Sequence, residues 1–179
     1  MQEILITVAL IIAVVIIVRL TFRTGKIKTL DPYKVTMKHI DKMDDGKEFE
    51  EYLFRLFKAL GYADTYKTVS SRDFGADVVF SDRDGCRYVV QAKRYAVSNP
   101  VGLGAVQEVY ASIRYYGAEK SLVITSGYFT EACETLAAYN GVKLLDRDDL
   151  DEIIRLFKAR KNEQAKDIIE EEPYMIHDE

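Results

Sequence analysis

RDFGADVVF at residues 72–80 and YVVQAK at residues 88–93 carry the clearest structural pattern in the sequence. Both runs are rich in β-branched and aromatic residues, and an Asp-Gly turn signal lies between them, so the pair predicts a β-hairpin. Folding the hairpin about Asp84 places Asp77 opposite Gln91. Because side chains alternate along a strand, Lys93 then lies on the same face as Gln91. The hairpin therefore predicts an acid, an amide and an ammonium group on one patch.

Such a patch can hold a divalent cation through oxygen ligands and place a positive charge beside water or phosphate. The inference depends on register, because a slightly different fold-back point would put Asp77 opposite Val90 instead. The alternative interpretation is structural: Asp77 ends a strand, Gln91 is an edge-strand polar group and Lys93 is a solvated charge. Spacing alone leaves both interpretations open.

Length and charge set broad limits on the function. A chain of 179 residues fits one domain with appendages and can bury a real core. The formal charge is −4, but residues 148–179 hold eleven acids against five bases, which leaves twenty bases against eighteen acids in the rest. The body is thus slightly basic, which neither demands nor excludes a phosphate-rich partner.

Cysteine and histidine offer little to catalysis. Cys86 and Cys133 have no Cys-x-x-Cys or Cys/His companion, which argues against a zinc site and suits a reducing compartment. His39 lies in a predicted linker and His177 in the tail. Histidine-based catalysis is therefore not expected.

Residues 4–22 are apolar apart from Arg19 and two threonines, and roughly 17 to 25 such residues cross a bilayer. Basic residues follow the segment and only Glu3 is charged before it, so the positive-inside rule places the remainder of the chain in the cytoplasm. No small-residue cleavage site ends the run, which disfavours a signal peptide. A buried core helix is the other alternative. We expect a single-pass anchor at residues 1–24, located in the cell membrane.

Apolar residues at helical spacing predict a helix over residues 48–60, ended by Gly61. Glu50 lies on the packed face of this predicted helix, whereas Glu51 faces solvent as an i,i+4 partner of Arg55. A carboxylate on a packed flank needs a partner, because burying an unpaired charge is costly. Glu50 is therefore a candidate site residue, although its place at the helix start would also suit the helix dipole.

The remaining elements predict an α/β fold with a mixed sheet and helices on both faces. After the anchor, we expect a linker at residues 25–46, the folded α/β domain at residues 47–162 and a disordered acidic tail at residues 163–179. The expected strands are 65–70, the two hairpin runs, 121–125 and 142–145, and the further helices are 103–116, 130–139 and 149–161.

Four blocks of residues within about 47–150 occur in an order typical of one protein family. The blocks are Phe49-Glu50 with Leu60-Gly61-Tyr62, then Asp73-x-Gly75-x-Asp77, then Gln91-Ala92-Lys93-Arg94, and then Val123-Ile124-Thr125-Ser126 with Phe129-Thr130 and Ala132. Together they resemble the Mrr-like restriction endonuclease catalytic domain, a branch of the PD-(D/E)-x-K nuclease superfamily. The resemblance implies a restriction-endonuclease-like fold.

The resemblance also implies roles for single residues. Asp77 and Gln91 would be ligands of Mg²⁺, with Mn²⁺ as an alternative ion, and Glu50 would hold the metal's water or a second ion. Lys93 would orient the attacking water and offset charge on the phosphorane. Asp73 matches the first acid of the family's turn, in a structural role. Gln91 stands where much of the superfamily has a carboxylate, and a neutral amide binds Mg²⁺ more weakly.

The resemblance implies a metal-dependent endonuclease that hydrolyses phosphodiester bonds in DNA. The apolar segment at residues 4–22 would hold this enzyme at the membrane. The alternative is an inactive nuclease fold that binds nucleic acid or docks a protein partner. No helix-turn-helix or winged helix fits in the residues available, so target choice would come from loops, a partner or a homodimer.

Overall fold

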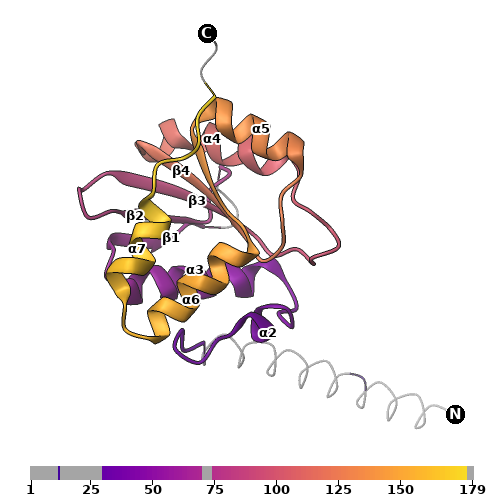
Figure 1. Ribbon diagram of the computed structural model, residues 1–179, viewed down its shortest axis with the longest axis vertical. Coiled ribbons are helices and arrows are strands. Elements are labelled where there is room, and N and C mark those ends of the chain that lie inside the picture. The colour runs from indigo at the N-terminus through magenta and orange to yellow at the C-terminus, as the bar shows by residue number, and fades with distance from the viewer. Residues whose placement is uncertain (1–11, 13–29, 70–73, 177–179) are drawn as a thin grey trace, which may run out of the picture. The chain divides into compact units, whose positions relative to one another are not determined.

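The computed structural model describes residues 12, 30–69 and 74–176, and one compact unit of the chain begins at Pro32 (Figure 1). The helices in the described residues are α2 (Met37–Ile40), α3 (Gly46–Leu60), α4 (Gly104–Tyr116), α5 (Glu131–Asn140), α6 (Arg147–Lys158) and α7 (Asn162–Glu170). The strands are β1 (Ala63–Lys67), β2 (Val78–Ser81), β3 (Arg87–Lys93), β4 (Lys120–Thr125) and β5 (Val142–Leu145).

The five strands form one sheet in the order β1-β2-β3-β4-β5. β1, β2 and β3 are antiparallel neighbours, and β3, β4 and β5 are parallel neighbours. The parallel pairs need crossover connections, which α4 and α5 provide. The predicted mixed sheet flanked by helices is confirmed, with strand and helix ends shifted by a few residues.

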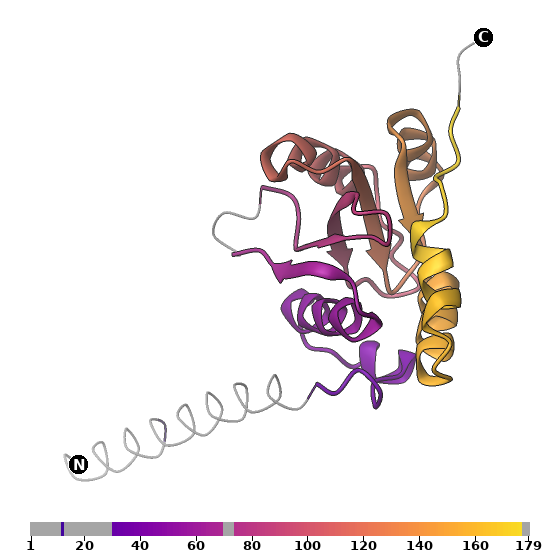
Figure 2. The same cartoon turned by 90° about the vertical axis from the view of Figure 1, so that its left-hand side faces the viewer.

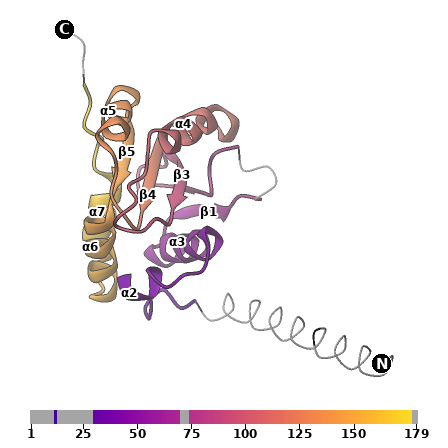
Figure 3. The same ribbon diagram turned by 90° about the vertical axis from the view of Figure 1, so that its right-hand side faces the viewer.

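Helices cover both faces of this sheet (Figures 2 and 3). α4 and α5 pack on one face, and α3 and α6 pack on the other, where α7 lies beside α6. The α4 face holds an aliphatic core that includes Val79, Val89 and Val123. The α3 face holds stacked rings, with Phe80 4.3 Å from Tyr62 between ring centroids. Because neighbours along a strand point to opposite faces, Asp77 lies on the same face as Val79, under α4.

Helix α3 begins and ends on local signals that are visible in the sequence. The side chain of Asp45 accepts a hydrogen bond from the backbone nitrogen of Glu48 at 3.1 Å, which caps the N-terminus. Gly61 follows the last turn in the left-handed conformation, at φ 92°. Its apolar stripe is buried, and consists of Phe49, Tyr52, Leu53, Leu56, Phe57 and Leu60.

The C-terminal region corrects our expectation of a disordered acidic tail from residue 163. Helix α7 forms there, with Ala165 and Ile169 buried at i,i+4 spacing. Its acids meet a cation at the β2–β3 turn, where Arg83 is ion-paired to Glu163, Asp167 and Glu170. An apolar stripe and a shared cation give this acidic segment enough contacts to order it.

The segment expected to be a linker is also partly built into the domain. Val35, Ile40 and Met43 are buried, and α2 lies within this stretch. The expected anchor at 4–22, and the turn residue Asp73, belong to stretches outside the described residues, apart from Ile12. Within the described part of the chain, no helix is both long and apolar enough to cross a bilayer.

Candidate active site

The β2–β3 hairpin has the register that the sequence predicts. Val78 pairs with Val90 and Val79 with Val89, which is the pairing that results from folding the hairpin about Asp84. Asp77 lies just before β2, where its backbone nitrogen donates to the carbonyl of Val90 at 2.7 Å and its side chain accepts from Gln91. The structure therefore brings the acid and the amide together at the open end of the hairpin.

Asp77 is 7% exposed, and so is Gln91. The Oδ2 atom of Asp77 accepts hydrogen bonds from Gln91 Nε2 at 2.7 Å and from the backbone nitrogen of Ala92 at 2.8 Å. A buried carboxylate without such donors would carry a large desolvation cost. These donors fix its orientation, and a carboxylate fixed in this way is pre-organised to act as a ligand.

Lys93 lies two residues beyond Gln91, on the same face of β3. Its Nζ donates to Oε2 of Glu108 at 2.6 Å, and Glu108 belongs to α4 on that face. Its carbonyl accepts from Thr125 Oγ1 at 2.7 Å and from the backbone nitrogen of Ser126 at 3.2 Å. Lys93 is thus held both through its backbone and through its ammonium group.

Gly75 shows why the turn before Asp77 contains a glycine. Its φ is +90°, and a Cβ at this position would lie 2.2 Å from the carbonyl oxygen of Glu108. Only a residue without a side chain lets the turn approach α4 so closely. The turn that leads to Asp77 therefore contacts the backbone of Glu108, the residue whose side chain pairs with Lys93.

Sequence reasoning missed Glu108. The signal that could have identified Glu108 is that it is the one acid between residues 104 and 116. Its partner, however, is distant in sequence and is set by packing of the helix on the sheet.

Glu50 is placed differently from the other predicted site residues. Its Oε2 is ion-paired to Nζ of Lys67 at 3.2 Å. Lys67 is opposite Val78 on the neighbouring strand, so the side chains of Lys67 and Val78 lie on the α3 face of the sheet. Asp77, in contrast, faces α4. The ion pair of Glu50 with Lys67 thus differs from the hydrogen bonds that join Gln91 to Asp77 and Lys93 to Glu108.

The donor set at the hairpin's open end suits a hard cation. No group of three or more His, Cys, Asp or Glu side chains in the described part of the chain is arranged so that it could hold a metal ion. Asp77 and Gln91 nevertheless offer a carboxylate and an amide, and Mg²⁺ commonly keeps several waters while taking one or two carboxylates and substrate phosphates. These residues fit one such ion with open positions for water and phosphate.

The segment after β4 fixes the end of β3. Ser126 Oγ donates to the carbonyl of Tyr95 at 2.9 Å and accepts from its backbone nitrogen at 3.0 Å. Arg147 donates to the carbonyl of Ser126 at 2.7 Å and binds both carboxylate oxygens of Asp41 at 2.8 Å. The hydrogen bond from Arg147 holds the pKa of Asp41 below its usual range. This clamp positions the strand that carries Lys93.

Among the described residues, the cysteines and His39 do not support thiol or imidazole chemistry. Both cysteines are free, and burial raises the pKa of Cys133 to about 11, so its nucleophilic thiolate is scarce at neutral pH. His39 is hydrogen-bonded to Thr36, the N-cap residue of α2, at 2.7 Å. The polar cluster at Asp77 is the stronger candidate for chemistry.

Comparison with known proteins gives an independent line of evidence. A family model described as restriction endonuclease, Mrr_cat, matches residues 40–154. No curated protein shows significant sequence similarity to the chain.

Solved structures share the fold at low sequence identity. The DNA modification-dependent restriction endonuclease AspBHI is 18% identical with a TM-score of 0.52, over 76% of this chain and 38% of its own. The MspJI restriction endonuclease, solved in complex with a 27-mer oligonucleotide, is 20% identical with a TM-score of 0.52, over 80% of this chain and 37% of its own. A protein of unknown function, AF1548, is 20% identical with a TM-score of 0.45, over 68% and 92%. The chain spans less than two fifths of the length of the two restriction endonucleases.

Proposed function

The chain belongs to the Mrr_cat restriction endonuclease family, and from that premise we propose that it is a metal-dependent endonuclease that cuts DNA at the Asp77 cluster. The observation that carries the proposal is the buried pair of Asp77 and Gln91 with Lys93 beside it, on one face of one hairpin. The fold similarity to MspJI, whose structure contains an oligonucleotide, supports DNA as the substrate.

In this proposal Asp77 and Gln91 hold a divalent ion, Mg²⁺ or Mn²⁺. When bound, such an ion polarises the scissile phosphate and lowers the pKa of a coordinated water. The Ala92 backbone nitrogen keeps the Asp77 carboxylate in place, since it donates to Oδ2 at 2.8 Å. Glu50 joins the centre only if its carboxylate leaves Lys67.

Lys93 supplies the positive charge that the reaction needs on the protein side. Its ammonium group orients the attacking water and offsets the charge that develops on the phosphate oxygens. Glu108 holds that ammonium group at 2.6 Å. Glu108 is therefore expected to position Lys93 until a phosphate competes for it.

The test is cleavage of supercoiled plasmid by the purified full-length chain in Mg²⁺, in Mn²⁺ and in EDTA. The proposal predicts nicked or linear product with either metal and none in EDTA. Asp77→Ala and Lys93→Ala should each lower the rate at least 100-fold, about the loss from removing one charge-stabilising group. Cleavage at an unchanged rate by either variant would rule out this assignment.

One observation favours a second candidate, an inactive nuclease fold that binds DNA or docks a protein. Gln91 is neutral, and its Nε2 is turned toward Asp77, so the pair is satisfied by its own hydrogen bond. This candidate predicts salt-dependent DNA binding without product in either metal. Absence of both binding and cleavage would point to protein docking.

Location and assembly are separate proposals. The apolar sequence of residues 4–22 supports a single-pass membrane anchor with the domain in the cytoplasm. Recovery of the full-length chain in the soluble fraction after cell lysis would contradict it. We also propose a homodimer on DNA, since two Asp77 sites could then act on two strands. Sedimentation on a DNA duplex tests that assembly, and a monomer bound throughout would exclude it.

A further inference from the structure

Two exposed aromatic rings lie next to the candidate active site, and the chemistry there does not use them. Phe74 is 52% exposed and Tyr115 is 61% exposed. Their ring centroids are 4.2 Å apart at an interplanar angle of 36°, and Tyr115 also meets Tyr116 edge-on at 4.9 Å. Rings that stay more than half exposed contribute little to the core, so core packing does not account for the pair.

The backbone at Phe74 is strained. Its φ is +44°, in the left-handed region that side-chain-bearing residues rarely adopt, and Gly75 follows at +90°. Strain of this kind costs free energy and concentrates at functional sites. Here the strain places the Phe74 ring over Tyr115 in an exposed position.

The pair lies within a few nucleotides' reach of the Asp77 cluster. Phe74 precedes Asp77 by three residues, which span at most about 10 Å of chain. Tyr115 follows Glu108 by seven residues, or about 10 Å along the axis of α4. Since successive nucleotides of a strand are about 3.4 Å apart along a duplex, either path corresponds to about three nucleotides.

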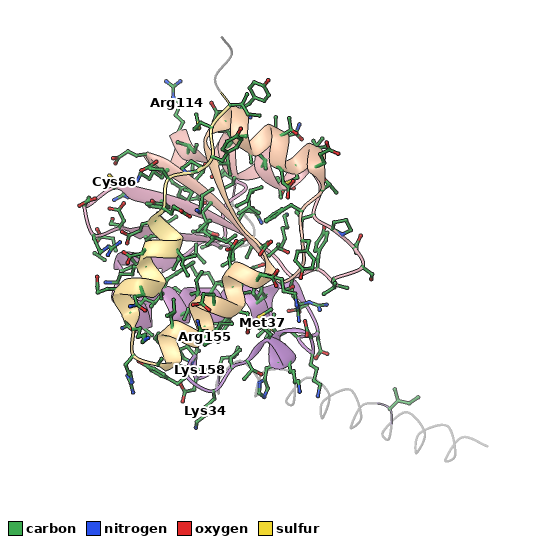
Figure 4. The ribbon with its side chains drawn as sticks, in the orientation of Figure 1. Lys34, Met37, Cys86, Arg114, Arg155 and Lys158 are labelled. Carbon is green, nitrogen blue, oxygen red and sulfur yellow. The ribbon has the colours of Figure 1, made fainter. Side chains whose placement is uncertain are left out.

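The charge around the pair suits a polyanion. Figure 4 shows Arg114 projecting outward from α4, one residue before Tyr115. The one acid of this helix, Glu108, is already paired with Lys93. The opposite end of the hairpin differs, because a pocket of about 570 Å³ at the β2–β3 turn is lined mainly by acids. Those acids, Asp82, Asp84, Asp167, Glu170, Glu171 and Glu172, would repel a nucleic acid.

We propose that Phe74 and Tyr115 form a stacking platform for an unpaired nucleobase of the DNA strand held at the Asp77 cluster. Arg114 contacts a neighbouring phosphate of the same strand. The inference rests on the proposed function, from which it takes DNA as the substrate. It adds the residues that would hold the DNA strand beside the Asp77 cluster. Aromatic side chains bind bases of any sequence, because every base has a π-face.

The test measures binding of labelled single-stranded DNA, by fluorescence anisotropy, to the full-length chain carrying Asp77→Asn, so that no strand is cut. Adding Tyr115→Ala should weaken binding about tenfold, the size of one lost base–aromatic stack. Tyr115→Phe keeps the ring and should bind like the parent chain. Tyr174→Ala removes an exposed tyrosine near the C-terminus and is the matched control, expected to leave binding unchanged.

A second readout reports stacking itself. An oligonucleotide with 2-aminopurine should lose fluorescence on binding to the parent chain and regain it with Phe74→Ala or Tyr115→Ala. Equal binding by parent and Tyr115→Ala, or an equal loss with Tyr174→Ala, would overturn the proposal. A change in sedimentation mass caused by Tyr115→Ala, with DNA binding intact, would assign the rings to a protein interface instead.

These results are separable from the nuclease proposal. If the chain with native Asp77 cuts no plasmid while DNA binding still depends on Tyr115, the nuclease assignment fails and the platform stands. If plasmid is cut and Tyr115→Ala binds single strands normally, the platform fails alone.

Discussion

The β2–β3 hairpin carries a charged cluster at each of its ends, and the two differ in kind. At the open end, Asp77 is 7% exposed and accepts hydrogen bonds from Gln91 and Ala92. At the turn, the side chain of Arg83 is 37% exposed and is ion-paired to three acids of α7. A count of ion pairs would favour the turn as the functional site.

The physical chemistry favours the open end. Ion pairs in solvent are screened, and each contributes little to the free energy of folding. The role we assign to the Arg83 cluster is therefore structural: it joins α7 to the β2–β3 turn. A buried carboxylate is costly unless the fold supports it, and here the support includes a strained turn and a close backbone contact at Gly75. The comparison teaches that burial and backbone constraint identify the site better than the number of charges does.

The largest effect on stability is expected from Gly75→Ala. Its Cβ would lie 2.2 Å from the Glu108 carbonyl oxygen at a φ of +90°, so we expect the free energy of unfolding to fall by about 3 kcal/mol or more. Gly85→Ala is the matched control, because Gly85 has a φ of +86° at the turn and nothing within 4 Å of a built Cβ. It should lose only about 1 kcal/mol. The free energies of unfolding are measured in urea. An equal loss for the two variants would contradict the claim that the backbone is more constrained at the open end of the hairpin than at its turn.

Gln91 tests the cluster through its chemistry. Gln91→Ala removes both the donor to Asp77 and the proposed oxygen ligand, so cleavage should slow about 100-fold, the upper range for loss of a metal-site partner. Gln91→Glu keeps an oxygen ligand and should retain most activity. Rates are measured on supercoiled plasmid with saturating Mg²⁺. If the Gln91→Ala variant cleaves plasmid at the native rate, Gln91 has no part in catalysis.

Glu108→Ala should have a smaller effect, because it frees Lys93 without removing it. We expect kcat to fall about tenfold with KM little changed, since the ammonium group loses its fixed position. Glu108→Gln keeps an acceptor and should restore part of the rate. Glu131→Gln, an exposed acid on α5, serves as the control and should cut at the native rate. A rise in KM alone would instead assign Glu108 to substrate binding.

The smallest effect is expected from Asp41→Asn. Asp41 is bound to Arg147 near the site, but it is partly exposed and should behave like the surface pairs at the turn. Its pKa is lowered in the folded state, so its contribution is present above its ordinary pKa near 4 and is lost as the pH falls through the lower folded value. We expect a loss below about 1 kcal/mol at pH 7 that shrinks at more acid pH. A loss independent of pH in urea unfolding would contradict the ion-pair origin.

The Asp-Gly turn signal predicted the hairpin, and folding about Asp84 predicted the observed pairing of Val78 with Val90. The sequence alone left a neighbouring register open, because a small change in the fold-back point shifts every pair. Glu108 could not be found in that way, because its contact with Lys93 depends on how α4 packs across the sheet. The role of each residue in catalysis stays a prediction.

The sequence misled us at α7, where a run of acids is typical of disorder. The buried pair Ala165 and Ile169 and the distant cation Arg83 order that segment, and neither effect is visible without the tertiary contacts. Glu50 illustrates the same limit, since helical spacing located its flank but not its partner Lys67 on the α3 face.

The sharpest test of the Asp77 cluster as the active site compares one variant from each end of the hairpin, Asp77→Asn and Arg83→Gln, in the full-length chain. Plasmid cleavage in Mg²⁺ and the melting temperature are recorded for both. We expect Asp77→Asn to abolish cleavage with little change in melting temperature. We expect Arg83→Gln to lower the melting temperature while cleavage at 25 °C continues at the native rate. Native-rate cleavage by Asp77→Asn, or loss of cleavage in a folded Arg83→Gln, would contradict this assignment of the active site.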